Sequence, residues 1–384
     1  MSYKKFKRQY LNQYPAISDL AQKARQRIPN VAWEYLQTGT GNEQLLRRNT
    51  SAFDDIVLQP QFCKGELVPD LQTTFLGQSF DAPFGIAPVG LTGLMWPQAE
   101  ILLARTARHY QIPFTLSTVA TETPETLAPH IGNIGWFQLY PPNSPELRAA
   151  LLDRAKKAGF HTLIVTADVP IPSRRERTRR AGLQMPPKIT PNFIWQALTH
   201  PTWTLRTLRN GLPRLRTIAE YAKEKSIKGV SFFVQKEWRG SLSWEYCEWL
   251  RDNWDGPVLL KGVLHPKDAE KAIQIGLDGI IVSNHGGRQF DAAPATIKAL
   301  PEIVRVAKGK TAILFDSGIR TGLDILRALS LGAEFVLLGR AFIYGVAALG
   351  QHGSDHVVEI LKDDLKNNMI QLGIERLDEL KGLH

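Results

Sequence analysis

The sequence predicts a single (β/α)8 barrel, and two observations lead to this expectation. First, one pattern occurs three times, in which an amphipathic run ends at glycine and a short apolar run follows: 145–159 then 162–166, 266–276 then 279–283, and 321–332 then 335–339. Glycine commonly ends a helix, and parallel strands buried on both faces read as continuous apolar segments. Second, five more apolar runs bring the predicted strands to eight: 84–88, 113–117, 135–139, 257–261 and 312–316. Eight strands alternating with helices favour a closed barrel.

The remaining segments complete the expected architecture. We expect one domain over residues 1–384, with the barrel at about 80–350, a helical extension before it, and a long insertion after the fourth strand at about 177–233. No Gly-x-Gly-x-x-Gly motif follows any predicted strand, which disfavours a nicotinamide-binding Rossmann unit.

Composition limits the compartment and the partners. Two cysteines, Cys63 and Cys247, are too few for a disulfide framework or a thiolate metal site, so we expect no metal and a reducing compartment. The basic segment 1–10 lacks the apolar stretch of a secretory signal, and no run of 18 apolar residues occurs, so we expect a cytoplasmic protein. The net charge of +10 predicts an anionic partner: nucleic acid, a membrane surface or an acidic substrate.

Small or polar residues stand at the carboxyl end of every predicted strand. In barrel enzymes the active site is built at this end, from several strands. In chain order they are Ala87, Ser117, Gln138 with Tyr140, Thr166 with Asp168, Lys261, Ser283 with His285, Asp316, and Gly339 with Arg340. The sequence therefore predicts one site that draws on all eight strands.

The run from Ser283 to Gln289 is the most informative part of this set. It places His285 and Arg288 three residues apart, directly after an apolar strand, with two glycines between them. Imidazole can accept a proton near neutral pH, and guanidinium binds a carboxylate through two hydrogen bonds. The run therefore predicts a general base beside a carboxylate clamp.

This run resembles the active-site signature of the FMN-dependent 2-hydroxy-acid dehydrogenases and oxidases, and the resemblance covers essentially the whole chain. It includes the segments 31–35, 136–140, 166–168 and 173–176. The resemblance implies that His285 is the base and that Asp168 orients it. It also implies that Arg288 and Arg175 hold the substrate carboxylate, and that Tyr140 and Tyr35 donate hydroxyl groups to the hydroxy acid.

The resemblance also implies FMN as the cofactor. Lys261 stands 24 residues before the histidine (285 minus 261), in the family's setting near the N1 and O2 edge of the flavin. The isoalloxazine shell would comprise Ala87, Pro88, Val89, Ser117, Gln138, Thr166 and Ser283. Barrels commonly bind a phosphate after strands seven and eight, where Ser317, Gly318, Arg320, Gly339 and Arg340 would hold the FMN phosphate, while Asp316 would bind ribityl hydroxyls.

One position bears on the substrate. Val119 stands where glycolate oxidases have tryptophan, so we expect a larger pocket that suits L-lactate, with (S)-mandelate or another aryl hydroxy acid as the alternative. The family resemblance further implies a homotetramer and an acceptor of quinone type. A soluble oxidase that uses O₂ remains a second possibility.

The insertion mixes positive charge with apolar side chains. Its basic residues include Arg177, Arg206, Arg209, Arg214 and Arg216, and its large apolar residues include Trp195, Leu198, Trp203, Leu205 and Leu208. This mixture is typical of a segment that lies on an anionic membrane surface, which predicts peripheral attachment to the cytoplasmic face. A solvated active-site lid is the alternative. A basic scaffold or nucleic-acid-binding barrel is disfavoured because no recognised module is present.

Overall fold

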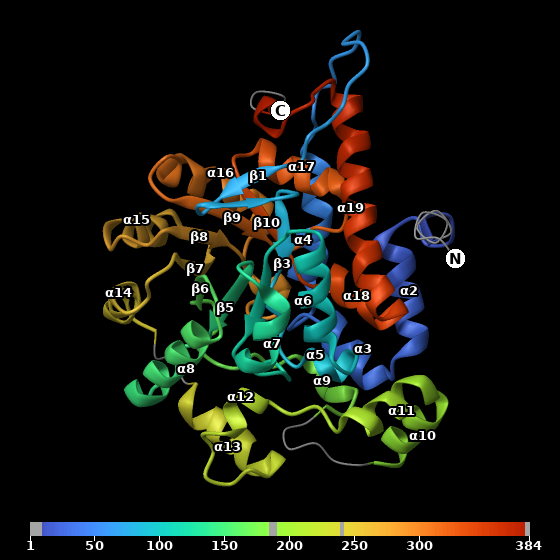
Figure 1. Ribbon diagram of the computed structural model, residues 1–384, viewed down its shortest axis with the longest axis vertical. Coiled ribbons are helices and arrows are strands. Elements are labelled where there is room, and N and C mark those ends of the chain that lie inside the picture. Colours follow the sequence, from blue (N-terminus) through green and yellow to red (C-terminus); the bar gives the residue numbers. More distant parts are fainter. Residues whose placement is uncertain (1–9, 184–189, 239–241, 381–384) are drawn as a thin grey trace.

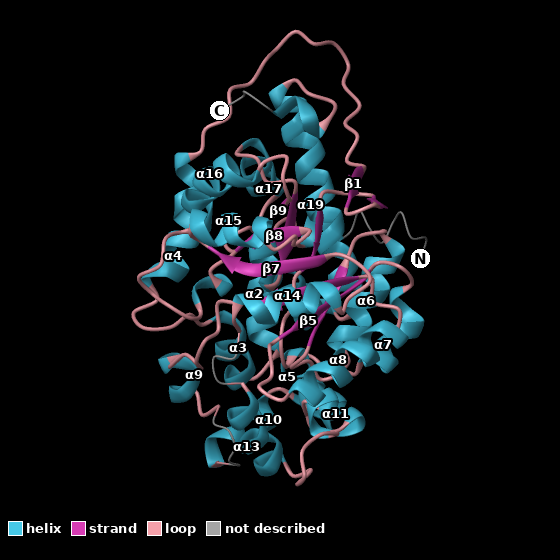
Figure 2. Cartoon of the chain, turned by 90° about the vertical axis from the view of Figure 1, so that its left-hand side faces the viewer, coloured by secondary structure: helices cyan, strands magenta, loops and turns pink. Residues whose placement is uncertain are grey.

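The computed structural model describes residues 10–183, 190–238 and 242–380, and its centre is a closed barrel of eight parallel strands (Figures 1 and 2). Neighbouring strands follow the order β10-β3-β4-β5-β6-β7-β8-β9. The strands are β3 (Phe84–Ile86), β4 (Phe114–Ser117), β5 (Gly135–Leu139), β6 (Thr162–Thr166), β7 (Val258–Val263), β8 (Gly279–Val282), β9 (Ala312–Asp316) and β10 (Phe335–Leu338). Seven lie within the runs predicted from sequence, and β7 overlaps its predicted run 257–261 but continues to Val263, so the (β/α)8 expectation is confirmed.

Helices surround the barrel, and several of them begin at a residue whose side chain caps the helix. Ser144 and Thr123 each accept a backbone N–H bond at the start of their helix, and Thr321 forms a capping box with Asp324. The helices between and after the strands are α5 (Thr92–Met95), α6 (Ala99–His109), α7 (Pro124–Ile131), α8 (Pro145–Lys157), α14 (Trp244–Asp252), α15 (Pro266–Gln274), α16 (Thr296–Ala307), α17 (Gly322–Ser330), α18 (Arg340–Leu349) and α19 (Gln351–Leu372). These caps satisfy N–H groups that a helix cannot satisfy internally.

The expected N-terminal helical extension is present. It contains α2 (Ile17–Arg27), α3 (Asn30–Gln37), α4 (Gln44–Ser51) and the short helix η1 (Ala52–Asp55). Helix α2 packs against α18, and Figure 1 shows the two side by side. Helix α3 and the segment after it border the carboxyl end of the barrel, because the main chain of residues 36 and 38 contacts Arg340 there.

A β-hairpin that we did not predict closes the opposite end of the barrel. Its strands β1 (Thr73–Phe75) and β2 (Gln78–Phe80) carry aromatic rings that pack on Phe335, the first residue of β10. The Phe75 and Phe335 ring centroids lie 4.9 Å apart, and those of Phe80 and Phe335 lie 5.5 Å apart. Trp136 on β5 contacts the same group. This aromatic plug separates the amino end of the barrel from solvent.

The insertion is helical where the structure describes it. It contains α9 (Glu176–Arg180), α10 (Pro191–Thr199), α11 (Pro201–Asn210), α12 (Arg216–Ala219) and α13 (Ile227–Glu237), so it ends at 237, beyond the expected 233. Figures 1 and 2 show α10, α11 and α13 on one side of the molecule. No helix in the described ranges is long and apolar enough to cross a bilayer.

Several residues that we assigned to a membrane surface face the protein instead. Trp203 is buried and donates from Nε1 to the carbonyl of Leu94, at 3.0 Å. Arg177 forms ion pairs with Glu34 and Glu43, both at 2.7 Å. Arg216 pairs with Glu122 at 2.8 Å. These side chains anchor the insertion, because buried carboxylates and an indole N–H need partners.

We expect Phe335→Ala to lower the free energy of unfolding by about 3 to 5 kcal/mol, because truncation leaves a cavity between the hairpin rings. Urea unfolding followed by tryptophan fluorescence measures this change. Phe62→Ala is the control, since the Phe62 side chain is 71% exposed, and its effect should stay within about 0.5 kcal/mol. Equal losses in the two variants would contradict the role of the plug.

Candidate active site

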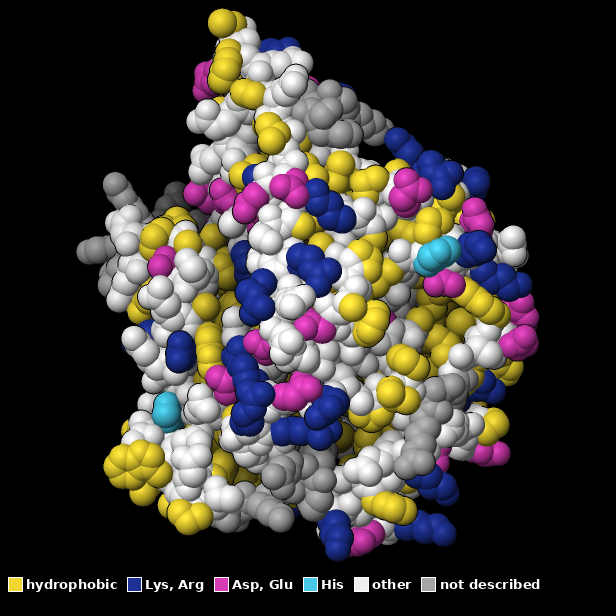
Figure 3. Space-filling model, turned by 180° about the vertical axis from the view of Figure 1, so that it is seen from behind, with side chains coloured by type: hydrophobic (Ala, Val, Ile, Leu, Met, Phe, Trp, Pro, Cys, Tyr) yellow, Lys and Arg dark blue, Asp and Glu magenta, His cyan; other side chains and the backbone are white. Residues whose placement is uncertain are grey.

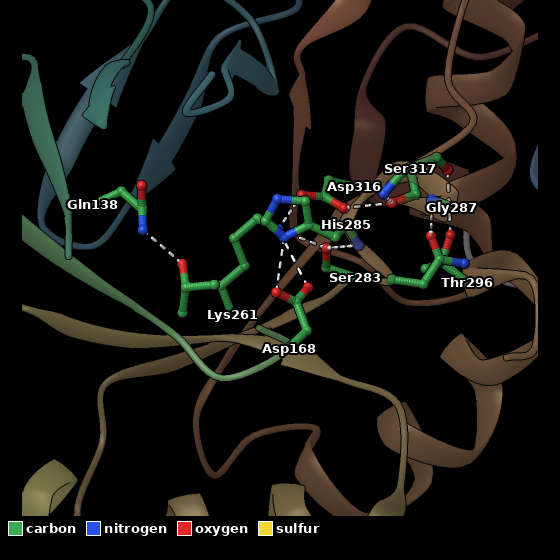
Figure 4. Close-up of polar contacts among 12 residues, drawn as sticks. Gln138, Asp168, Lys261, Ser283, His285, Gly287, Thr296, Asp316 and Ser317 are labelled. Atoms are coloured by element: carbon green, nitrogen blue, oxygen red, sulfur yellow. Dashed lines mark hydrogen bonds and ion pairs between the residues drawn. The ribbon is translucent and has the colours of Figure 1, made fainter. Parts of the chain in front are cut away.

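The carboxyl ends of the strands surround a cavity of about 1470 Å³. Most residues predicted for the site line it: Tyr35, Ala87, Pro88, Val89, Tyr140, Thr166, Arg175, Lys261, His285, Arg288, Asp316, Ser317, Gly318, Arg320, Gly339 and Arg340. The other four predicted residues, Ser117, Gln138, Asp168 and Ser283, are bonded to residues of the cavity wall or to one another. The structure therefore brings the whole predicted set together, and Figure 4 shows the polar contacts around Lys261, Asp168 and His285.

The loop after β8 aims His285 into this cavity. His285, Gly286 and Gly287 have φ values of 56°, 63° and 76°, so three successive residues adopt left-handed conformations. The turn is held by bonds from the His285 N–H to Ser283 Oγ, at 3.1 Å, and from the Gly286 N–H to Ser317 Oγ, at 3.0 Å. A Cβ atom at Gly286 would lie 2.6 Å from Arg340 Nη1, so only glycine fits there. Backbone strain of this kind is common at functional sites.

His285 lies between a carboxylate and a phenol. Its Nδ1 is 2.8 Å from Asp168 Oδ1, and its Nε2 is 3.3 Å from the Tyr140 hydroxyl. Burial lowers the pKa of His285, although the Asp168 carboxylate opposes this shift, so the imidazole is neutral at pH 7. The tautomer that donates from Nδ1 to Asp168 leaves the Nε2 lone pair directed into the cavity. His285 can therefore accept a proton there.

The two neighbours of His285 keep opposite protonation states. Burial alone would raise the pKa of Asp168, but Lys261 and His285 outweigh it and hold that pKa below its ordinary value. Burial, with Asp168 adding to it, raises the pKa of Tyr140 to about 12. Asp168 is thus an anion that can stabilise a protonated imidazole, and Tyr140 is a hydrogen-bond donor.

Lys261 on β7 is the buried cation at the centre of the site. Its Nζ is 2.8 Å from Ser283 Oγ, 3.3 Å from Asp316 Oδ2 and 3.7 Å from Asp168 Oδ2. Burial opposes the charge, but Asp316 and Asp168 raise the pKa of Lys261 above its ordinary value. The next residue, Gly262, has φ 108°, and a Cβ there would lie 2.6 Å from Asp168 Cβ. This glycine lets β6 and β7 approach closely enough for the ion pair.

Five arginines around the cavity form no ion pair with a carboxylate among the described residues: Arg175, Arg179, Arg288, Arg320 and Arg340. Arg288 Nη2 donates to the carbonyls of Tyr35, at 2.6 Å, and Leu36, at 2.8 Å. Burial lowers the pKa of Arg288 to about 10 and that of Arg340 to about 9, and Arg175 contributes to both shifts. The site therefore holds surplus positive charge, which an anionic ligand would neutralise.

The donors around the barrel end fit the cofactor that the sequence predicts. A chain of bonds crosses three strands, from Ser117 Oγ to Gln138 Oε1, at 2.7 Å, and from Gln138 Nε2 to Thr166 Oγ1, at 2.8 Å. The Thr166 hydroxyl and the Lys261 ammonium thus line one side of the cavity, with the Gln138 amide bonded behind Thr166, and such donors suit the polar edge of a flavin. Arg320 and Arg340 stand on the side formed by β9 and β10, where a phosphate would lie. The residues present fit FMN.

Some contacts in the site were not predicted. Asn284 and Asn49 exchange side-chain hydrogen bonds of 2.7 and 2.8 Å, which fix the loop after β8 to α4. Trp238, at the end of the insertion, donates from Nε1 to the carbonyl of Tyr140, at 2.8 Å. Arg340 donates to three main-chain carbonyls, on Leu36, Thr38 and Gly286. No spacing in the sequence signals these pairs, because their members are far apart along the chain.

Comparisons with known proteins agree with this geometry. The sequence profile described as FMN-dependent dehydrogenase matches residues 24–384. An L-lactate dehydrogenase of Ectopseudomonas mendocina (strain ymp) is 40% identical over 371 residues, which cover 95% of this chain and 97% of the relative. An L-lactate dehydrogenase of Pseudomonas aeruginosa (strain LESB58) is 39% identical, with coverages of 95% and 96%.

Solved structures with a similar fold act on related acids. The crystal structure of the monotopic membrane protein (S)-mandelate dehydrogenase has a TM-score of 0.90 and 34% identity, and the match covers 95% of this chain and 97% of that one. The structure of mandelate oxidase with benzoyl-formic acid has a TM-score of 0.81 and 30% identity, with coverages of 97% and 98%.

We expect the pKa of His285 to lie below 6.5 and to move in opposite directions in two variants. Asp168→Asn should lower it, because the stabilising anion is lost, whereas Lys261→Met should raise it, because a nearby cation is removed. NMR titration of protein labelled at histidine Cε1 measures both shifts, and the signal that disappears in His285→Gln identifies the residue. Shifts of the same sign would contradict the charge arrangement described above.

Proposed function

Since this chain belongs to the family of FMN-dependent dehydrogenases, we propose that its substrate is L-lactate, which it oxidises to pyruvate. The chain is an FMN-dependent 2-hydroxy-acid oxidoreductase. The observation that carries the proposal is the position of His285 between Asp168 and Tyr140, beside arginines that lack a carboxylate partner. The two relatives named L-lactate dehydrogenase support this choice of acid.

The substrate carboxylate would bind to Arg288, with Arg175 and the Tyr35 hydroxyl beside it. These groups line the same cavity, and the Tyr35 hydroxyl now donates to the carbonyl of Gly90, at 3.2 Å. A bidentate bond to guanidinium would orient the α-carbon as well as supply affinity. The substrate hydroxyl would then lie between Tyr140 and His285 Nε2.

Proton transfer would proceed through His285. Its Nε2 takes a proton from the substrate, and Asp168 stabilises the imidazolium that forms, as a buried carboxylate does in a His–Asp pair. Tyr140, which keeps its own proton, donates to the substrate oxygen. FMN, when bound, accepts the pair of electrons that the hydroxy acid loses. Asp168 is a positioning residue, since it acts through His285.

FMN would be held along two sides of the cavity. The ammonium of Lys261, with Gln138 and Thr166, would bond to the polar edge of the ring system, and Ser117 supports Gln138. Ala87, Pro88, Val89 and Ser283 complete this shell. Arg320 and Arg340 would bind the phosphate, together with Ser317, Gly318 and Gly339, and Asp316 would accept bonds from ribityl hydroxyls. An ammonium near the flavin edge favours an anionic, reduced cofactor.

(S)-Mandelate is the second candidate substrate. Val119 lines the cavity, and a Cβ at Gly90 would lie 2.6 Å from Val119 Cγ2, so these two residues bound the space beside Tyr35. A branched aliphatic wall admits either a methyl group or a ring. The structural likeness to (S)-mandelate dehydrogenase favours the ring. For the electron acceptor, the alternative is O₂, which a soluble oxidase would use. The likeness to mandelate oxidase favours this alternative.

We further propose that the enzyme attaches to the cytoplasmic face of an anionic membrane and passes its electrons to a quinone. The outward face of α10 and α11 supports this: Trp195, Leu198, Leu205 and Leu208 are 66 to 71% exposed. Figure 3 shows hydrophobic side chains grouped over these helices. Arg206 and Arg209 on α11 are also exposed. Such a face binds anionic lipid through apolar burial and charge together. Family resemblance alone favours a homotetramer, which sedimentation would measure.

We expect the purified protein to be yellow and its flavin absorption to bleach on anaerobic addition of L-lactate. Bleaching by (S)-mandelate at a higher rate would make the aryl acid the substrate, and bleaching by D-lactate alone would reverse the handedness. A colourless protein that takes up no added FMN would refute the proposed function. His285→Gln is the control variant: it should keep the yellow colour while bleaching slows by about 10² to 10⁴, because a general base is lost.

We expect the quadruple change of Trp195, Leu198, Leu205 and Leu208 to Gln to release the enzyme from vesicles that contain anionic lipid. Co-sedimentation with vesicles measures this, and turnover with a soluble acceptor should not change. High salt should weaken binding of the unchanged protein, because each interfacial Arg contributes about 1 kcal/mol that salt screens. Phe62→Gln with Val68→Gln removes exposed apolar side chains elsewhere and serves as the control. Retained binding in the quadruple variant would favour a lid.

A further inference from the structure

The active-site cavity extends beyond the residues that the proposed function assigns to FMN and the hydroxy acid. Its volume is about 1470 Å³. Part of the wall belongs to residues that have no role in the chemistry described above. They lie on α13 and on the segment after β6: Ile171, Leu183, Val234 and Trp238. We call this part of the cavity the apolar arm.

The apolar arm begins next to the catalytic residues. The Trp238 indole is fixed by its bond to the carbonyl of Tyr140, whose hydroxyl contacts His285. The Phe233 ring supports the indole from the side, with centroids 6.4 Å apart and an interplanar angle of 82°. Val234 and Leu183 add aliphatic surface. A flat apolar ring would therefore find a preformed indole wall beside the site of oxidation.

The apolar arm also borders the side of the molecule that we propose to face lipid. Its helix, α13, lies on that side with α10 and α11 (Figures 1 and 2). On α13, Phe232 points outward and is 72% exposed, while Val234 lines the cavity; Ile171 at the other wall is 69% exposed. The arm thus has apolar surface both inside and outside. A ligand that partitions into a bilayer would meet apolar side chains on both surfaces.

We propose that the apolar arm binds the ring of the quinone that accepts the electrons. This inference rests on the proposed function and gives its acceptor a site. In the net reaction L-lactate loses two electrons and two protons to become pyruvate, and the quinone gains both pairs to become a quinol. A small polar acceptor gains no affinity from contact with the apolar indole ring of Trp238. The apolar arm therefore favours an apolar, ring-shaped acceptor over a small polar one.

Val234→Asn tests the apolar arm, because it replaces a side chain by an amide of similar size that has no partner there. With a short-chain quinone such as ubiquinone-1, kcat/KM should fall about tenfold. Flavin reduction by L-lactate in stopped flow, and turnover with hexacyanoferrate, should stay within about twofold. Phe232→Asn, two residues away on the outward face, is the matched control and should leave all three rates in solution unchanged.

Other outcomes of this experiment would overturn the proposal. An equal loss with hexacyanoferrate would mean a structural defect, and slower flavin reduction would assign the arm to the side chain of the substrate. An unchanged rate with ubiquinone-1 would remove the quinone from the arm altogether.

Photolabelling of the unaltered, FMN-loaded enzyme is a second test of the apolar arm. It requires neither turnover nor a folded variant. After illumination with an azidoquinone and digestion with trypsin, the label should appear on the peptide Gly229–Lys236, which carries Val234. Excess ubiquinone-1 should prevent the labelling. A label on other peptides, or one that ubiquinone-1 does not displace, would refute the arm as the acceptor site. If L-lactate failed to bleach the flavin while this peptide was labelled, the proposed substrate would fail and the arm would stand.

Discussion

The charge balance around Lys261 is the constraint on which the rest of the site depends. One buried ammonium stands between Asp316 and Asp168, at 3.3 and 3.7 Å, and Asp168 in turn binds His285 at 2.8 Å. Without this ammonium the two buried carboxylates would lose their shared cation, and the pKa of Asp168, which Lys261 lowers, would rise. The same ion pairs join the ends of β6, β7 and β9 to the loop after β8. The barrel end and the base are thus held by one electrostatic group.

Surplus positive charge links the N-terminal extension to the barrel. Arg288 and Arg340 donate to the main-chain carbonyls of Tyr35, Leu36 and Thr38, so the segment that carries Tyr35 is positioned by the cations that await anionic ligands. Carbonyl oxygens satisfy the N–H groups of arginine without neutralising its charge. The two arginines therefore keep the charge that attracts an anionic ligand while they fix the position of the segment that carries Tyr35.

The insertion combines two roles that its composition could not separate. Trp203, Arg177 and Arg216 bind it to the protein, whereas Trp195 and Leu205 remain on the outside. The sequence alone did not distinguish the inward residues from the outward ones, because both groups consist of tryptophans, arginines or leucines in one basic segment. On α11 helical periodicity decides between them, because Trp203 and Thr207, four residues apart, face inward while Leu205 faces outward. Only the inward set met partners from distant parts of the chain.

The sequence by itself determined the barrel, because apolar runs and helix-ending glycines are local signals, and each of the eight strands overlaps a predicted run. It also determined which residues gather at the site, since strand ends of a parallel barrel must meet at one face. Tertiary structure decided what local patterns cannot carry: the aromatic plug on Phe335, the bond from Trp238 to Tyr140, and the partners that Trp203 and Arg216 of the insertion find on the barrel side. Each of these depends on contacts between residues far apart in the chain, which no spacing along the sequence records.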